Sequence, residues 1–309
     1  MLTATRLTFR LHRFEVGALA ILTLLLTTAA WLVASRLDAV GFSAACIDRT
    51  DAGVPASCER PAQTFYDIAG QASPIQTFIA IVPFIAAILL GVAIVGREIE
   101  RGTTRLAWSL APSRRRWLLA RLVPIAVLIA VVTYVLGMAA DRLLAATSPD
   151  LDTANAFAQF GFRGVVLAAR VFFVFALALL VGAVMGRVMP AVIVAAVVAW
   201  FSISGGEQIH NEILQRETVA VPAEAVRSGD MQFDQRFQLP DGSLIGWEEM
   251  ERIDPPRDEN WTPKYPMVSL VIPGTRYRQV ELREVGALAG GSLVALLATG
   301  FLIRRRRPG

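Results

Sequence analysis

Residues 97–121 read REIERGTTRLAWSLAPSRRRWLLAR, and the membrane topology of the chain follows from this charged segment. It contains seven arginines and two glutamates, and a long apolar run lies on each side of it. Because charged groups are costly in hydrocarbon, the stretch must be a loop between two membrane spans. The excess of arginine places this loop on the cytoplasmic side of the membrane.

The composition is that of a membrane protein. The chain has 309 residues, of which 54% are apolar and 18% are charged, and its mean hydropathy is +0.51. A soluble domain carries about 25% charged residues. A hydrocarbon core of roughly 30 Å requires about 20 apolar residues per helix. The composition therefore predicts an all-α protein that crosses the membrane several times.

Six apolar runs predict six transmembrane helices. They lie at residues 16–35, 74–96, 122–140, 164–186, 191–204 and 285–303. Six crossings leave both termini on one side of the membrane. Arginines gather in the N-terminal flank, in the 97–121 loop, at Arg187 and in the tail 304–307. The positive-inside rule places all four, and both termini, on the cytoplasmic side.

The apolar runs divide the chain into four parts. We expect an interfacial helix at 1–15, transmembrane helices one to five at 16–204, an extracytoplasmic domain at 205–284, and the sixth helix with a basic cytoplasmic tail at 285–309.

The segment 1–15 has the pattern of an amphipathic helix that contacts membrane lipids. Two stripes at helical spacing lie on adjacent faces. They consist of Arg6, Arg10 and Arg13, and of Leu7, Leu11 and Phe14. The alternative is a basic flank without an ordered helix.

The segment 205–284 is polar and contains fifteen acidic and nine basic residues. It has no apolar run long enough to cross a membrane. Residues 233–239 and 268–273 are candidate strands, and 207–217 could continue the fifth helix. The segment is therefore predicted to be a small extracytoplasmic domain, with a partly ordered loop as the alternative.

Cys46 and Cys58 are the only cysteines, and both lie in the loop 37–73. This loop is extracytoplasmic in the predicted topology, and such surroundings are oxidising. We expect a structural disulfide between them; two free thiols are the alternative.

Several chemistries lack their residues. The only lysine, Lys264, does not belong to a phosphate-binding G-x-x-x-x-G-K-[ST] motif. His210 has no second histidine near it, so no metal site or catalytic site is predicted. No basic stretch interleaved with aromatics suggests a nucleic-acid surface. The sequence thus favours a protein that is not itself an enzyme.

The 97–121 loop has features that a basic flank does not explain. Ser113 is a good N-cap for a helix that runs into the third span, and Pro112 precedes it. Gly102 is costly inside a helix, so a local reason for it is expected. Glu98 and Glu100, together with two tryptophans that we expect to be exposed, favour a surface that docks a protein. The tryptophans are Trp108 and Trp117.

At this loop the chain resembles a known family. Arg-Glu-Ile-Glu-Arg-Gly-Thr (97–103), followed by Ser-Arg-Arg-Arg-Trp-Leu-Leu-Ala-Arg (113–121), is similar to the membrane subunit of type-two ABC exporters in their actinobacterial form. The resemblance covers about 1–204 and 285–309. The chain departs from the family at 205–284, where short re-entrant helices are usual.

The resemblance implies a permease of the bacterial cytoplasmic membrane. Two copies would pair, here as a homodimer, with two cytoplasmic ABC ATPase subunits, which bind ATP and Mg²⁺; the permease itself needs no cofactor. The coupling residues would be Glu98, Glu100, Arg101, Gly102 and Thr103, to which we add Trp108, Arg114, Arg115 and Trp117 from the same loop.

The residues that line the substrate pathway are harder to predict. Hydroxyls of Thr77, Ser202 and Ser204 are candidates, although hydroxyls within spans often bond to their own backbone. Arg170 is the one clear charge within a span. It is either functional or extends to the outer membrane interface.

Two other classes of function compete with the permease. One is a membrane sensor or scaffold whose 205–284 domain binds an external ligand. The other is a membrane enzyme with external carboxylates, for which the sequence offers no set of catalytic residues.

Overall fold

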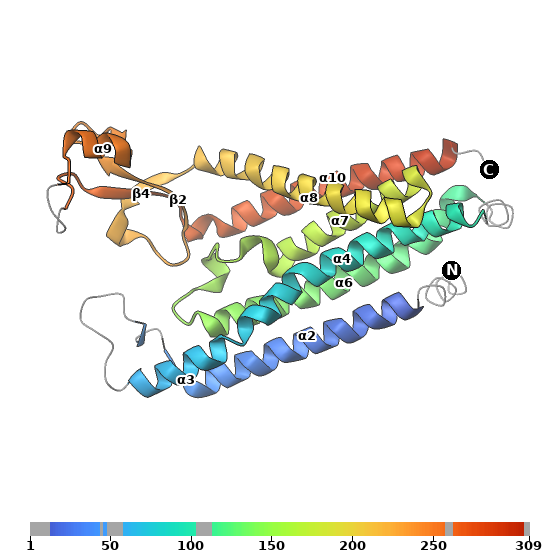
Figure 1. Cartoon of the computed structure of the whole chain (residues 1–309), viewed down its shortest axis with the longest axis horizontal. Helices are drawn as coiled ribbons and strands as arrows, with labels where there is room; N and C mark the ends of the chain where they lie inside the picture. Colours follow the sequence, from blue (N-terminus) through green and yellow to red (C-terminus); the bar gives the residue numbers. More distant parts are fainter. Residues whose placement is uncertain (1–12, 44–45, 48–57, 103–112, 257–261, 306–309) are drawn as a thin grey trace. The chain divides into compact units, whose positions relative to one another are not determined.

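The computed structural model describes residues 13–43, 46–47, 58–102, 113–256 and 262–305 (Figure 1). These residues form two compact units. The helical unit is drawn from Met1–Asp150, Gln159–Ser204 and Glu281–Gly309, and the sheet unit from Leu151–Ala158 and Gly205–Val280. The predicted interfacial helix at 1–15 lies almost wholly outside the described residues.

Within the described residues, six helices are long and apolar enough to cross a membrane. They are α2 (Arg13–Val40), α4 (Ala72–Glu100), α6 (Arg114–Thr147), α7 (Gly164–Met185), α8 (Val188–Gln215) and α10 (Tyr277–Arg305). Each coincides with one predicted span, which confirms a multi-pass membrane protein.

Most helices extend beyond their apolar runs. The 34 residues of α6 correspond to a length of about 50 Å, well above a hydrocarbon thickness of roughly 30 Å. The predicted N-cap is confirmed, because Ser113 Oγ accepts a hydrogen bond from the Arg116 N–H at 3.2 Å. The polar start of α6 is thus helical well before its apolar run begins.

A short helix, α3 (Glu59–Ala69), lies in what the sequence predicted to be the loop 37–73. Phe65 is its buried residue, and its ring stacks on Phe42 with ring centroids 4.4 Å apart. Ala62, Ile68 and Ala69 also pack against the core that contains these two rings, so α3 lies beside α2 with an apolar side turned inward.

The core of the helical unit is the contact between α4 and α7, which lie side by side (Figure 1). Glycines allow their backbones to approach closely. A Cβ on Gly91 would lie 2.8 Å from Phe175 O, and one on Gly182 would lie 2.9 Å from Val92 O. Such small-residue contacts are typical of helix packing in membranes. α4 also contacts α6 and α2.

The helices differ in how much of their surface this unit covers. In the most apolar 18-residue stretch of α7, 56% of the residues are buried. The same share is 22% in α10 and 17% in α8. The outward residues of α8 are large and apolar, for example Met189, Ile193, Trp200 and Phe201. In a bilayer such faces meet lipid tails or another protein.

The sheet unit contains a four-stranded antiparallel sheet with the order β1-β4-β2-β3. Its strands are β1 (Val219–Pro222), β2 (Met231–Gln238), β3 (Leu244–Ile245) and β4 (Met267–Ile272). The candidate strands at 233–239 and 268–273 are confirmed as β2 and β4. The predicted continuation of the fifth helix is also confirmed, because α8 ends at Gln215.

A small core holds the sheet unit together. Phe237 and Ile245 of the sheet and Met250 of α9 (Trp247–Ile253) form a buried cluster. Short 3-10 turns complete the described structure, at η3 (Thr153–Asn155), η4 (Phe160–Phe162), η5 (Ala223–Ala225) and η6 (Gly274–Arg276). η4 belongs to the helical unit. The segment 151–158 belongs to the sheet unit because Phe157 N–H donates to Gly229 O at 2.9 Å.

Candidate functional site

The charged motif that follows the second apolar run forms the last turn of α4. α4 ends at Glu100, and the N–H groups of Arg101 and Gly102 donate to Arg97 O and Ile99 O, each at 3.1 Å. Gly102 has φ +66°, which L side chains rarely adopt. The expected local reason for this glycine is therefore a left-handed turn that ends the helix.

Glu98 forms an ion pair with Arg121 of α6. The side chain of Glu98 is 17% exposed and that of Arg121 is 18% exposed. The Arg121 guanidinium also lies 4.9 Å from the ring centroid of Trp117. Partial burial reduces the screening of such a pair by salt. Glu98 therefore fastens the end of α4 to the start of α6.

Glu100 caps a different helix. Its Oε2 accepts a hydrogen bond from the backbone N–H of Val188, the first residue of α8, at 3.0 Å. The first N–H groups of a helix have no partner within it, and the helix dipole favours a carboxylate at this end. Gly186 ends α7 with φ +66° just before this point. Glu100 therefore fixes the turn between α7 and α8 to α4.

A third contact completes the set. Arg97 forms an ion pair with Glu15 of α2 at 2.6 Å, with 37% and 30% of the side chains exposed. Within four residues, α4 thus reaches α2, α6 and α8. We call the set Arg97, Glu98, Glu100, Glu15, Arg121 and Val188 the α4 terminal cluster. In Figure 1 the start of α2, the end of α4 and the start of α6 lie at the same end of the helical unit.

Other residues of the predicted coupling loop are only partly described. Arg101 and Gly102 are exposed. Thr103, Trp108 and the side chains of Arg114 and Arg115 lie outside the described residues. The expectation that Trp117 is exposed is wrong: 8% of it is exposed, because α6 already packs on the core at this first turn.

The hydroxyl candidates for a substrate pathway have ordinary surroundings. Thr77 is exposed, and its hydroxyl donates to Ser73 O at 3.0 Å, which is the backbone bond expected of such residues. Ser202 and Ser204 are half-buried in α8.

Arg170 is the exception among the pathway candidates. It is 6% exposed, and its Nε donates to Glu284 Oε1 of α10 at 2.6 Å. The carboxylate of Glu284 balances the charge of Arg170 inside the protein. The side chain of Arg170 therefore does not extend to the membrane interface. Glu284 is not among the residues predicted for a site, because it lies before the apolar run of the sixth span, whereas α10 begins at Tyr277.

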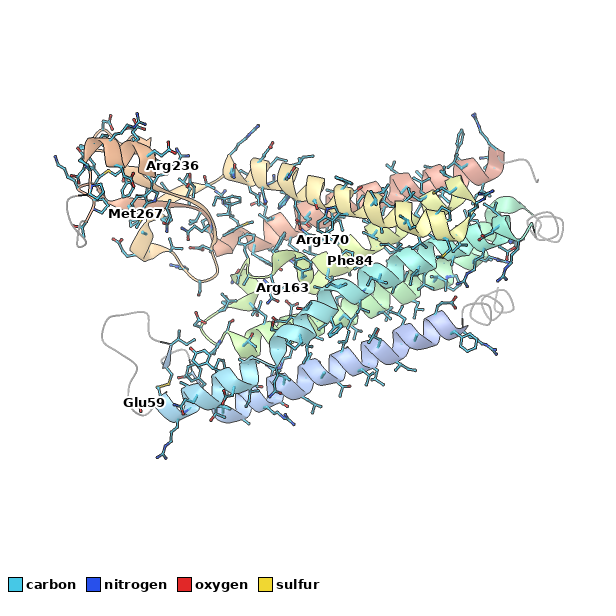
Figure 2. All side chains as sticks on the ribbon, in the orientation of Figure 1. Glu59, Phe84, Arg163, Arg170, Arg236 and Met267 are labelled. Carbon is cyan, nitrogen blue, oxygen red and sulfur yellow. A yellow bond between two sulfur atoms is a disulfide. The ribbon has the colours of Figure 1, made fainter. Side chains whose placement is uncertain are left out.

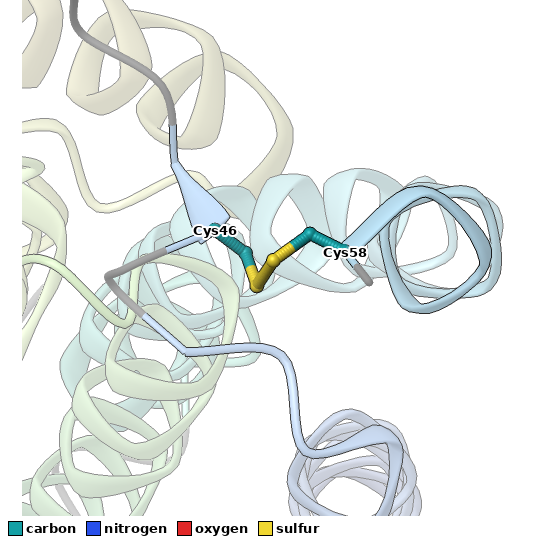
Figure 3. The surroundings of a disulfide bond; sticks show 2 residues. All are labelled: Cys46 and Cys58. Atoms are coloured by element: carbon teal, nitrogen blue, oxygen red, sulfur yellow. A yellow bond between two sulfur atoms is a disulfide. The ribbon is translucent and has the colours of Figure 1, made fainter. Parts of the chain in front are cut away.

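The predicted disulfide is confirmed. Cys46 and Cys58 are bonded, with their Cα atoms 5.6 Å apart (Figure 3). Cys58 immediately precedes α3 and is buried. The disulfide therefore attaches the start of α3 to the segment that follows α2.

Comparison with known proteins gives one match. Residues 16–204 match the family described as "ABC-2 membrane transporter related". This region contains α3 to α7 and most of α2 and α8. It also contains every member of the α4 terminal cluster except Glu15, which precedes it by one position. No curated protein and no solved structure matches the chain.

Proposed function

Because the chain belongs to the ABC-2 membrane transporter related family, we propose that it is the permease subunit of an exporter that is driven by a separate cytoplasmic ATPase. The chain is a multi-pass membrane protein, and membership of this family implies an ATPase partner in general. In the proposal, ATP and Mg²⁺ bind to that partner, and the permease performs no covalent chemistry.

The observation that carries the coupling proposal is the α4 terminal cluster. The exposed residues Arg101 and Gly102 follow directly after it, and the segment up to Ser113 connects α4 to α6. An ATPase that binds this connection and moves it would pull on one turn of α4. Glu98 and Glu100 would then pass the displacement to α6 and α8, because rigid helices transmit motion through their fixed contacts.

This role differs from direct docking. Glu98 and Glu100 already have partners in Arg121 and Val188. We therefore propose that they transmit the movement and that Arg101, Gly102 and Thr103, with Trp108, Arg114 and Arg115, provide the docking surface. The arginine excess supports a cytoplasmic position for this end and for both termini.

A second copy of the chain is the proposed partner within the membrane. α8 and α10 expose large apolar residues along most of their length, including Val197, Trp200, Leu297 and Phe301. A permease that encloses a pathway needs a second wall, and these helices could meet their counterparts across a two-fold axis.

The test is purification of the native chain from its own membranes in mild detergent, with mass spectrometry of the proteins that accompany it. We expect an ABC ATPase. If the two residues transmit movement, the Glu98→Ala/Glu100→Ala variant should still purify with this ATPase. It should, however, no longer stimulate ATP hydrolysis by the bound ATPase. The matched control is Glu248→Ala/Glu249→Ala, which removes two exposed carboxylates from α9.

Absence of an ATPase from the native preparation would contradict the proposed function. Loss of the ATPase from the Glu98→Ala/Glu100→Ala variant alone would contradict the division of roles and support direct docking by these two residues.

A sensor or scaffold is the second candidate. The sheet unit has an open hollow of about 440 Å³, lined by Gln232–Gln235 of β2 and by Trp247. If no ATPase accompanies the chain, this hollow is the place to test for ligand binding.

A further inference from the structure

The face that α10 turns toward the helical unit is unusually polar. The buried residues of α10 that belong to this unit are separated by three, four or eight positions. This helical spacing places them on one face of α10. They are Glu281, Glu284, Ser292, Ala295, Thr299 and Ile303. The opposite face carries Leu282, Leu293, Val294, Leu297 and Phe301. α10 is therefore attached mainly by polar and small side chains rather than by interlocking apolar ones.

The strongest of these attachments is the pair between Glu284 and Arg170 of α7. The two side chains are 10% and 7% exposed, and Nε lies 2.6 Å from Oε1. The Arg170 guanidinium packs directly on Gly161, where any Cβ would overlap with Nη1. Figure 2 labels Arg170 near the beginning of α7. The position of this arginine is thus set on one side by Glu284 and on the other by a glycine.

A second ion pair lies beside the first. Arg163, which immediately precedes α7, donates to Asp141 Oδ1 of α6 at 2.7 Å, and 3% of its side chain is exposed. A Cβ on Gly164 would lie 3.2 Å from Asp141 Oδ2 and 4.0 Å from Glu281 Oε1. The carboxylates of α6 and α10 therefore converge on the start of α7. We call Asp141, Arg163, Arg170, Glu281 and Glu284 the α7 ionic cluster; the side chain of Asp141 is 25% exposed and the other four residues are buried.

Beyond this end of α10, Gly291 packs on the ring of Phe173, and Ser292, Ala295 and Thr299 are buried. Gly286 and Gly290 lie on the opposite face, where a Cβ would have nothing within 4 Å. Buried ion pairs are costly to break because separation leaves uncompensated charges in a medium of low dielectric. The pair between Arg170 and Glu284 therefore opposes the separation of this end of α10 from α7.

We propose that Arg170 and Glu284 are positioning residues that latch the sixth span to the fourth in the resting transporter, and that this latch opens in each ATP-driven cycle. The proposal rests on the proposed function. Arg170 is 16 residues from Gly186, which ends α7 two positions before Val188 of the α4 terminal cluster. This spacing corresponds to about 24 Å of helix. In this proposal, movement of α4 at one end of α7 breaks the ion pair between Arg170 and Glu284 near the other end.

The distance between α7 and α10 can be tested by crosslinking. The native cysteines are joined in a disulfide, so a Phe173→Cys/Gly291→Cys chain would present two adjacent free thiols. Loss of the Phe173 ring also removes the contact that a side chain at 291 would meet. The chain is purified with its ATPase, and crosslinking by a short bis-maleimide is compared without nucleotide and after trapping with MgATP and vanadate.

We expect the crosslinked fraction to fall by about threefold in the trapped complex, as a shift in the population of the latched state requires. Closing the crosslink before nucleotide is added should abolish ATPase stimulation. An equal crosslinked fraction in both states, in a complex that hydrolyses ATP, would overturn the latch while leaving the proposed function intact.

A second set of variants tests the ion pair itself. Single substitutions leave one buried charge without its partner, so the crosslinking chain is combined with Arg170→Gln/Glu284→Gln. This neutral pair should lower crosslinking in the resting state by about threefold. The exchange Arg170→Glu/Glu284→Arg should restore it. The control is Asp38→Asn/Arg142→Gln, which removes a partly exposed ion pair between α2 and α6. If the chain with Arg170→Gln/Glu284→Gln gave the same crosslinked fraction as the chain that keeps Arg170 and Glu284, the latch would be overturned.

Discussion

Glu100 Oε2 accepts a hydrogen bond from the backbone N–H of Val188 at 3.0 Å, across 88 residues of sequence. A carboxylate at the end of one membrane-spanning helix thereby caps the beginning of another. The contact combines a backbone partner with a favourable helix dipole. It makes the position of α8 depend on the last turn of α4.

Removal of this cap gives the first prediction. Glu100→Ala should lower the free energy of unfolding by about 1 kcal/mol, the usual effect of losing an N-cap. Glu100→Gln retains an oxygen acceptor and should lose only the charge contribution, about 0.5 kcal/mol. Thermal unfolding in detergent, followed by intrinsic tryptophan fluorescence, would measure both. Equal losses in the two variants would show that the charge matters and the hydrogen bond does not.

Exchange of an ion pair gives the second prediction. Glu98→Ala or Arg121→Ala should each destabilise the chain by on the order of 1–2 kcal/mol, between the effects of exposed and buried pairs. The exchange Glu98→Arg/Arg121→Glu should restore both stability and ATPase stimulation, because the link between α4 and α6 is kept. The comparison is made on complexes purified with the ATPase.

The exchange also separates two explanations of Glu98. If Glu98 bound a basic side chain of the ATPase directly, an arginine at position 98 would repel that side chain. The exchanged chain would then fold but fail to stimulate ATP hydrolysis by the ATPase.

The spans were predictable because the length of an apolar run is a local property of the sequence. The roles of Glu98 and Glu100 were suggested by the same local pattern, but their partners were not. Arg121 is 23 residues from Glu98, and Val188 is 88 residues from Glu100. Contacts of this kind depend on how helices pack, which no spacing within one helix specifies.

Two residues lie in surroundings that differ from those the sequence predicts. The charged loop predicts an exposed Trp117, yet Trp117, Leu118, Leu122 and Ile125 are all buried on α6. Their helical spacing continues the apolar face of the third span into the loop, and that signal was available. Glu284 was assigned to the polar domain because a charge inside a span is costly, unless a partner such as Arg170 is buried with it.

The disulfide gives the third prediction. Cys46→Ser/Cys58→Ser should lower the free energy of unfolding by around 3 kcal/mol, the chain-entropy value for a short loop. α3 should remain helical, because Phe65 still stacks on Phe42. Thermal unfolding with and without a reducing agent measures the effect. The native chain should become less stable on reduction, whereas the serine variant should not respond; a response of the serine variant would contradict the assignment.

Close packing of α4 on α7 gives the fourth prediction. A Cβ on Gly91 would lie 2.8 Å from Phe175 O and 2.9 Å from Ala178 Cβ, and backbone atoms cannot move aside as a flexible side chain can. Gly91→Ala should therefore destabilise the chain by about 1–3 kcal/mol through overpacking. It should also weaken the stimulation of ATP hydrolysis in the partner ATPase, because α4 carries the α4 terminal cluster.

Gly290→Ala is the matched control, because a Cβ there would have nothing within 4 Å. Alanine also favours the helix by up to about 1 kcal/mol relative to glycine, so this variant should be as stable as the native chain or slightly more so. The two variants are compared by thermal unfolding in the same detergent. Equal destabilisation by both would contradict the packing argument, because it would mean that the open face of α10 is as crowded as the α4–α7 contact. That outcome would instead indicate that a second copy closes on α10 in the assembled transporter.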